Sequence, residues 1–429
     1  MAHSRPISSL SKVFIATAFI NFLIGAFFGG WMSSNPSTMG LLGPLHGEIN
    51  PFGWLTMMIY GMTYAVLALS TGFRPPRTEV GWIHWMVAEL GVILIVVSIM
   101  VNSSTMFRIG LGLQAIAPVI FLGNLLSAVI SGKKSGRNFP QDMMSQSQTL
   151  NPLKRSDTLK GSDRVGQRGT DVSLMLYLVG VWWIWIQSFF HTGVNPGLGA
   201  DAAKVLIYYG WIGGTVWSVG LHLMPRQAST GHISARAASF GQVAWFAAVV
   251  IQAVGMIVNP SWQGITGRLL GITAVYQGLL FLYSLSSRNA KSADRPLFPK
   301  WSHTAWSAAL VFEVLLGIFL LIGLDPLSLL SMHLLFLGFA TSLLYGVGYG
   351  LFPWFFGGVK PAGAYAWTQI FCSLFGFILM GIAFAGYAIP GWNSIPTSPL
   401  LAVGGILAAI GAILFLVQWP FLLLRGVKE

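Results

Sequence analysis

Apolar residues fill twelve long stretches of the chain, and polar residues gather in the short gaps between them. The core of a bilayer is about 30 Å thick, and a helix needs about 20 apolar residues to cross it. The pattern therefore predicts an all-α, polytopic membrane protein with about twelve transmembrane helices in a single transmembrane bundle over residues 1–429. The predicted spans are 12–33, 46–70, 82–102, 106–130, 173–193, 203–224, 236–258, 265–286, 301–324, 328–352, 363–386 and 399–424.

The positions of Lys and Arg predict the orientation of these helices, because loops rich in Lys and Arg stay in the cytoplasm. With the N-terminus inside, twenty-one of the 24 cations fall on the inner side, and only Arg108, Lys204 and Arg268 fall on the outer side. We expect a multi-pass protein of a bacterial-type inner (plasma) membrane with both termini in the cytoplasm. The segment 131–172 is rich in Ser, Gln and Lys and is predicted to be a polar cytoplasmic loop.

The second and tenth spans resemble each other, since both place a glycine, a second glycine and a tyrosine at offsets zero, eight and eleven. The sixth span matches more weakly. The shared positions are Gly53, Gly61 and Tyr64 in the second span, Gly338, Gly346 and Tyr349 in the tenth, and Gly210 and Ser218 in the sixth. These spans are four apart, so the pattern predicts three pseudo-repeated four-helix units around the membrane normal. The alternative is that membrane helices share glycines and aromatic residues by chance.

Composition supports the membrane assignment and excludes several other classes. Only 8% of the residues are charged and 54% are hydrophobic, whereas a soluble domain carries roughly 25% charged residues. The net charge of +12 does not indicate nucleic acid as a partner, because the cations lie in separate gaps and form no basic face. The single cysteine, Cys372, excludes a disulfide framework and the CxxCH motif of covalent haem attachment.

Four residues are candidate metal or haem ligands in the outer half of the membrane. His46 and His333 lie at the outer starts of the second and tenth spans, His191 lies at the outer end of the fifth, and Glu48 is the nearby carboxylate. Two histidines at similar depth on repeat-related helices are what axial ligation of a haem iron by two imidazoles requires. The alternative is that these histidines are interfacial residues bonded to headgroups or water.

Other polar residues in the spans have a structural and a functional interpretation. His84 lies between Trp82 and Trp85 and is predicted to anchor its helix at the inner interface. Glu89 and Glu313 are expected inside the membrane, where a carboxyl group is costly. A proton path and a buried hydrogen bond in the helix packing both explain them.

The twelve spans, the repeats and the two outer histidines together resemble subunit I of the haem-copper oxidase superfamily. Residues 45–54 and 333–339 look most like the branch of cbb-type oxidases and nitric oxide reductases, and also like the haem- and copper-containing NnrS proteins associated with nitric oxide stress. The resemblance implies that His46 and His333 are the axial ligands of a low-spin haem b. Arg108 and Arg268 are then better candidates than Lys204 for binding its propionates, because a guanidinium donates two parallel hydrogen bonds.

The sequence departs from the family pattern at the ligands of the second metal centre. Ser331 stands where active oxidases have a histidine two residues before the low-spin ligand, and Val205 and Leu206 stand where the sixth helix carries another. The seventh span, 236–258, contains no histidine. We therefore expect no dinuclear centre, do not favour copper, and expect no reduction of oxygen or nitric oxide by the familiar mechanism. Whether the protein is an enzyme stays open.

The leading hypothesis is a haem b-binding, oxidase subunit I-like membrane protein that transfers electrons within a respiratory or redox complex. Its partners would be the lipid bilayer and a redox partner subunit or a cytochrome. One alternative is an NnrS-like haem or copper protein of the nitric oxide stress response, with His46, His191, His333 and Glu48 as ligands. Another is a haem-free membrane carrier.

Overall fold

A computed structural model describes residues 8–69, 76–134, 160–190, 198–227, 233–286, 299–355, 362–392 and 394–419. Over these ranges the chain forms helices and turns without a strand, which confirms the all-α class. Within them, ten helices are long and apolar enough to cross a membrane. The second and sixth predicted spans correspond to the continuous helical runs α2–η2–α3 and α8–η4–α9, each of which changes its winding midway.

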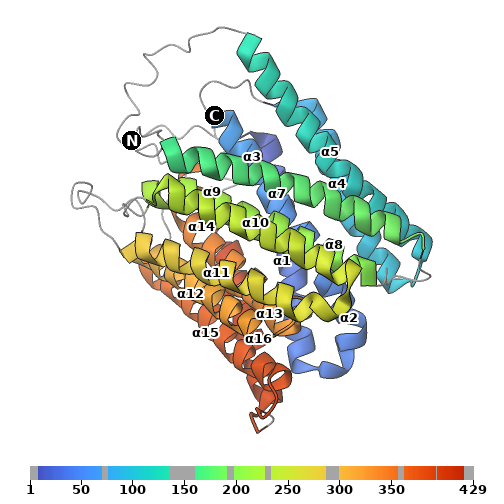
Figure 1. Ribbon diagram of the computed structural model, residues 1–429, viewed down its shortest axis with the longest axis vertical. Helices are drawn as coiled ribbons and strands as arrows, with labels where there is room; N and C mark the ends of the chain where they lie inside the picture. The colour runs from blue at the N-terminus through green and yellow to red at the C-terminus, as the bar shows by residue number, and fades with distance from the viewer. Residues whose placement is uncertain are drawn as a thin grey trace.

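The helices follow the predicted order of three four-helix units, and most of the long ones run roughly along a common direction (Figure 1). The first unit is α1 (Ser9–Ser34), α2 (Met39–Glu48), η2 (Ile49–Thr56), α3 (Met57–Leu69), α4 (Thr78–Met100) and α5 (Ser104–Lys134). The second unit is α7 (Lys160–Gln187), α8 (Leu198–Val205), η4 (Leu206–Gly213), α9 (Gly214–Gln227), α10 (Ala235–Val258) and α11 (Gln263–Ser286). The third unit is α12 (Lys300–Leu321), α13 (Leu329–His333), η7 (Leu334–Thr341), α14 (Ser342–Phe355), α15 (Gly363–Ala388) and α16 (Thr397–Val417).

The units close into a ring, because α5 packs on α7, α11 packs on α12, and α16 packs on α1. The outward faces of the helices are apolar. On α4, for example, Ile83, Met86, Leu90 and Ile93 are exposed at helical spacing. Apolar surface of this extent suits contact with lipid.

The second helix of each unit winds as a π-helix for eight residues in its middle. In all three units this segment begins four residues before the repeat glycine and ends three residues after it, counted from Gly53, Gly210 and Gly338. π-Helical turns are rare and occur mostly as short insertions in α-helices. Their recurrence at one register confirms the predicted repeat, including the weakly matching sixth span.

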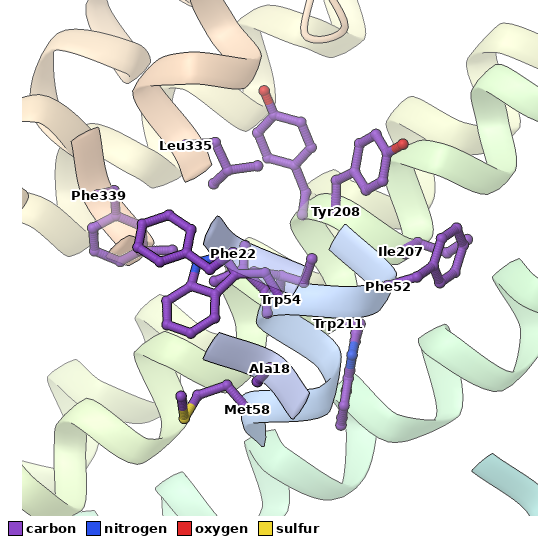
Figure 2. Close-up of a cluster of buried hydrophobic side chains, with 14 of the residues drawn as sticks. Ala18, Phe22, Phe52, Trp54, Met58, Ile207, Tyr208, Trp211, Leu335 and Phe339 are labelled. Carbon is purple, nitrogen blue, oxygen red and sulfur yellow. The ribbon is translucent and has the colours of Figure 1, made fainter. Parts of the chain in front are cut away.

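The three π-helical segments meet at the centre of the bundle, where buried aromatic side chains gather (Figure 2). The indole of Trp54 donates to the hydroxyl of Thr341 at 3.3 Å, and the indole of Trp211 donates to Thr56 at 3.0 Å. Trp54 and Trp211 each follow the repeat glycine by one residue, and Thr56 and Thr341 follow it by three. At the third junction the same positions are held by Phe339 and Gly213, which cannot form this bond. Donor and acceptor are thus both absent from this pair, so neither residue has an unpaired side-chain hydrogen-bonding group.

Two predictions from the sequence differ from the structure. Helix α5 extends to Lys134 and helix α7 begins at Lys160, so residues 131–134 and 160–172 of the predicted polar loop are helical, and residues 135–159 of it lie outside the described residues. Gly166 and Gly169 explain the early start of α7, because they allow this helix to pack closely on α9 at Ser218. His84 is fully buried and is not an interfacial anchor. It lies inside the first unit, where its Nδ1 is 3.1 Å from the hydroxyl of Tyr64.

Candidate metal centre

The imidazole rings of His46 and His333 lie side by side, although 286 residues separate them in the sequence. Their centroids are 6.1 Å apart and their planes differ by only 15°. His46 sits in the last turn of α2, just before η2, and His333 ends α13, just before η7. The repeat therefore brings the two histidines to corresponding ends of facing helices, as the sequence predicted.

The hydrogen bonds of both rings fix the same tautomer. Nδ1 of His46 is 2.8 Å from the carbonyl oxygen of Gly25, and Nδ1 of His333 is 2.7 Å from that of Leu329. A carbonyl oxygen can only accept, so each Nδ1 carries the proton and donates it. Neither Nε2 has a hydrogen bond to another described residue, and in this tautomer each Nε2 keeps its lone pair. This is the usual arrangement of metal-binding histidines, whose second ring nitrogen donates to a carbonyl.

The separation of the rings suits one metal ion between them. Bonds from a metal to imidazole nitrogen are about 2 Å long, so two imidazoles on opposite sides of an ion have centroids about 6 Å apart. The observed 6.1 Å agrees with this value. The two histidines are thus close enough to bind one metal ion together. Within the described ranges, no group of three or more His, Cys, Asp or Glu side chains is placed to hold a metal ion.

Two glycines of α1, Gly25 and Gly29, leave a notch in the surface of this helix, and the notch holds His46 in its orientation. A β-carbon at Gly29 would lie 2.9 Å from Cε1 of His46, and one at Gly25 would lie 2.5 Å from Oδ1 of Asn50. Asn50 in turn donates from Nδ2 to the backbone oxygen of His46 at 2.8 Å. On the other side, the ring of Phe384 lies 4.4 Å from the ring of His333. Glycines in α1 and one aromatic side chain in α15 therefore limit rotation of both imidazoles.

These supporting residues were not among the candidates from sequence. Asn50 could have been predicted, because it follows His46 by one helical turn and its side chain can reach back to that residue. Gly25, Gly29 and Phe384 could not, because their role depends on which helices become neighbours.

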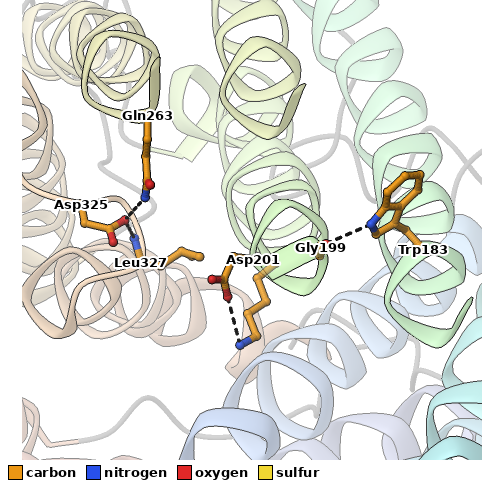
Figure 3. A network of polar contacts seen from close by, with 7 residues as sticks. Trp183, Gly199, Asp201, Gln263, Asp325 and Leu327 are labelled. Atoms are coloured by element: carbon orange, nitrogen blue, oxygen red, sulfur yellow. Dashed lines mark hydrogen bonds and ion pairs between the residues drawn. The ribbon is translucent and has the colours of Figure 1, made fainter. Parts of the chain in front are cut away.

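Glu48 lies in a charged cluster beside the histidine pair. Lys204 on α8 interacts electrostatically with Glu48 and forms an ion pair with Asp201 at 3.6 Å (Figure 3). The charge of this lysine is therefore already paired with Asp201, which weakens it as a site for a further anion.

The two predicted arginines lie at different junctions of the bundle. Nε of Arg108 donates to the carbonyl oxygen of Ser188 at 2.9 Å, and its guanidinium lies 5.5 Å from the ring centroid of Phe189. Arg268 lies beside Gly323 in the turn that leads to α13, the helix of His333. His191, the remaining predicted ligand, lies outside the described residues.

The turn before α13 is fixed by hydrogen bonds from the second unit. Gln263 donates to the Asp325 carboxylate at 3.1 Å, which also accepts from the backbone nitrogen of Leu327 at 2.9 Å (Figure 3). The hydroxyl of Tyr209 donates to the carbonyl oxygen of Pro326 at 2.8 Å. These bonds set the position from which α13 starts, and so they place His333.

Ser331 and Val205, which stand where the oxidase pattern has histidine ligands, have ordinary structural roles. Ser331 donates to the backbone oxygen of Asp325 at 2.7 Å, and its backbone nitrogen donates to Ser328 at the start of α13. Val205 is fully buried just before η4. Ser331 and His46 each lie three residues before the start of their π-helical segment, so they occupy equivalent positions in the repeat. Val205, Glu48 and His333 each lie one residue before it and are likewise equivalent.

Comparison with known proteins identifies a similar fold. No protein-family model matches the sequence, and no curated protein matches it. Among solved structures, the chain is similar to a haem-copper terminal oxidase determined as a dimer by cryo-electron microscopy, with a TM-score of 0.62 and 14% sequence identity. The match covers 96% of this chain and 82% of the oxidase chain. It confirms the predicted oxidase-like fold.

Proposed function

We propose that this chain is an oxidase subunit I-like membrane protein that holds a low-spin haem b between His46 and His333 and transfers electrons. The observation that carries the proposal is the pair of adjacent, nearly parallel imidazoles, in which each Nδ1 donates to a carbonyl oxygen and each Nε2 keeps its lone pair. The oxidase-like fold supports it, because the similar solved structure is a haem-copper terminal oxidase.

The residues of the chain would hold the group rigidly. His46 and His333 supply the two axial nitrogens, Gly25 and Leu329 keep the ligand tautomer, and Phe384 stops the His333 ring from turning. Such a haem would supply one-electron oxidation and reduction.

We further propose that both termini lie in the cytoplasm and that the histidine pair lies near the outer face of an inner-type membrane. The distribution of Lys and Arg supports this orientation. A redox partner, either another subunit of a complex or a cytochrome, would then exchange electrons at or near that face.

The visible spectrum of the purified full-length protein tests the proposed function. We expect sharp α and β bands of a low-spin b-type haem after reduction with dithionite, and a pyridine haemochromogen assay that gives one haem b per chain or more. A colourless protein, purified from cells with ample haem, would contradict the proposal and favour the haem-free carrier.

Replacing Gly29 tests whether the notch in α1 orients His46. We expect Gly29→Ala to weaken haem binding by about tenfold or more, the usual cost of disturbing the groups that orient a ligand, because the added β-carbon would lie 2.9 Å from Cε1 of His46. Gly30→Ala is the matched control, since its β-carbon would meet Ala409 at an ordinary 3.4 Å. Titration of apoprotein with haemin measures both. Equal affinities of the two variants would show that the notch does not position His46.

Replacing the arginines tests how the propionates are held. We expect Arg268→Gln to lower the haem midpoint potential by on the order of tens of millivolts, because a nearby positive charge stabilises the added electron. Arg108→Gln should have the smaller effect, since Arg108 is engaged at the end of α7. Redox titration followed at the α band gives both values. Wild-type potential and haem occupancy in both variants would assign the propionates to neutral donors.

A further inference from the structure

Glu313 places a carboxyl group in the middle of α12, away from the histidine pair at the helix ends. The side chain is fully buried, and neither carboxyl oxygen has a hydrogen-bond partner among the described residues. No described ion pair includes it. Nearly all buried polar atoms in proteins are hydrogen-bonded, so this group requires an explanation.

One polar group lies beside the carboxyl. The indole of Trp217 on α9 lies near enough to affect the Glu313 carboxyl, but its Nε1 does not reach hydrogen-bond geometry with any described residue. Aromatic rings enclose this indole, because its ring centroid lies 4.7 Å from that of Phe339 and 4.9 Å from that of Phe281. A hydrogen-bond donor and two acceptors therefore lie together, all without direct partners, inside an apolar part of the bundle.

The apolar surroundings of Glu313 favour the neutral form of its carboxyl group. An ionised carboxylate in an apolar interior needs a cation or several donors to replace the water it has lost. Tyr209 is close enough to interact with Glu313, but its hydroxyl donates to the carbonyl oxygen of Pro326. No described cation pairs with Glu313, and a neutral carboxylic acid is the form that these surroundings accept.

We propose that Glu313 is a proton-binding site inside the membrane, a neutral carboxylic acid that one water molecule links to Trp217. The water accepts hydrogen bonds from the indole N–H and from the O–H of the acid and donates one to the carbonyl oxygen of the acid, so every polar atom of both groups has a partner. The site holds one exchangeable proton per chain. It is independent of the proposed haem, since neither residue belongs to the histidine pair.

Infrared spectroscopy of the full-length protein in detergent or lipid tests this proposal without reference to activity. We expect a carboxylic-acid C=O band that moves to lower frequency in D₂O, and we expect Glu313→Gln to remove one component of it. Glu89→Gln is the matched control for a second acid in a span, since Glu89 already accepts from Asn21 at 3.1 Å. Its substitution should leave the Glu313 component in place. Trp217→Phe should shift that component without removing it.

Covalent labelling of the wild-type protein gives a readout that needs no variant to fold. Dicyclohexylcarbodiimide adds the O–H of a carboxylic acid across one of its C=N bonds, and the adduct rearranges to a stable N-acylurea. The reaction needs the carboxyl proton, so it reports the neutral acid. We expect mass spectrometry to find the label on the peptide that contains Glu313. An acid band unchanged in Glu313→Gln, or an unlabelled Glu313, would overturn the proton site. A band unmoved by Trp217→Phe would overturn the water link.

Discussion

Replacing either His46 or His333 with alanine is expected to remove the low-spin haem spectrum, because each ring supplies one of the two axial nitrogens. We expect the two substitutions to have the same effect, since both rings use Nδ1 for a carbonyl oxygen and lie next to each other with their planes nearly parallel. We expect the α band of the reduced protein to fall to background in both variants. Absorbance spectra normalised to protein concentration measure the effect.

The control for these variants follows from the structure. His84→Ala is unsuitable, because His84 is fully buried against Tyr64 and its loss would disturb the first unit. His222→Ala is better matched, since His222 is only half-buried and lies on α9. It should retain the haem. Size-exclusion chromatography confirms that the alanine variants stay folded, and full haem retention in a folded His46→Ala or His333→Ala protein would remove the assignment.

We also expect copper far below one ion per chain, and no consumption of oxygen or nitric oxide at enzymatic rates. Ser331 and Val205 occupy the positions where the oxidase pattern requires imidazoles, and both are already used in structure, one as a hydrogen-bond donor and one in the core. Among the described residues, the surroundings of the histidine pair therefore offer no set of ligands for a second metal. Elemental analysis and electrode measurements with a reduced electron donor check this, and one copper ion per chain together with turnover would refute it.

Much of the fold could be predicted from the sequence, because helices in a membrane satisfy their backbone hydrogen bonds locally. Length and hydropathy therefore located the spans, and spacing alone related Gly53 to Gly338. The π-helical winding was not predictable. It depends on contacts between helices distant in the sequence, such as the bond from Asn21 on α1 to the backbone oxygen of Gly53 at 3.1 Å, which no local pattern encodes.

The sequence could indicate the two histidines that the structure brings together, although their role as ligands stays a prediction, and it could not indicate the residues around them. His46 and His333 stood out because imidazoles are unusual in apolar spans and sat near repeat glycines. The notch at Gly29 and the ring of Phe384 became visible only when α1 and α15 were known to flank the pair. His84 was misplaced for a related reason. Neighbouring tryptophans suggest an interface, yet which face of a helix is buried depends on the helices around it.

The bonds at the centre of the bundle impose an order on how the protein is made. Trp54 finds its acceptor 287 residues later in the chain, and Thr56 finds its donor 155 residues later. During translation, the first unit is therefore inserted into the bilayer before Trp211 and Thr341 have been synthesised. At that stage the Trp54 indole and the Thr56 hydroxyl lack their partners. The core is complete only after the C-terminal unit has been inserted. Membrane insertion and final assembly are thus separate events in the biogenesis of this protein.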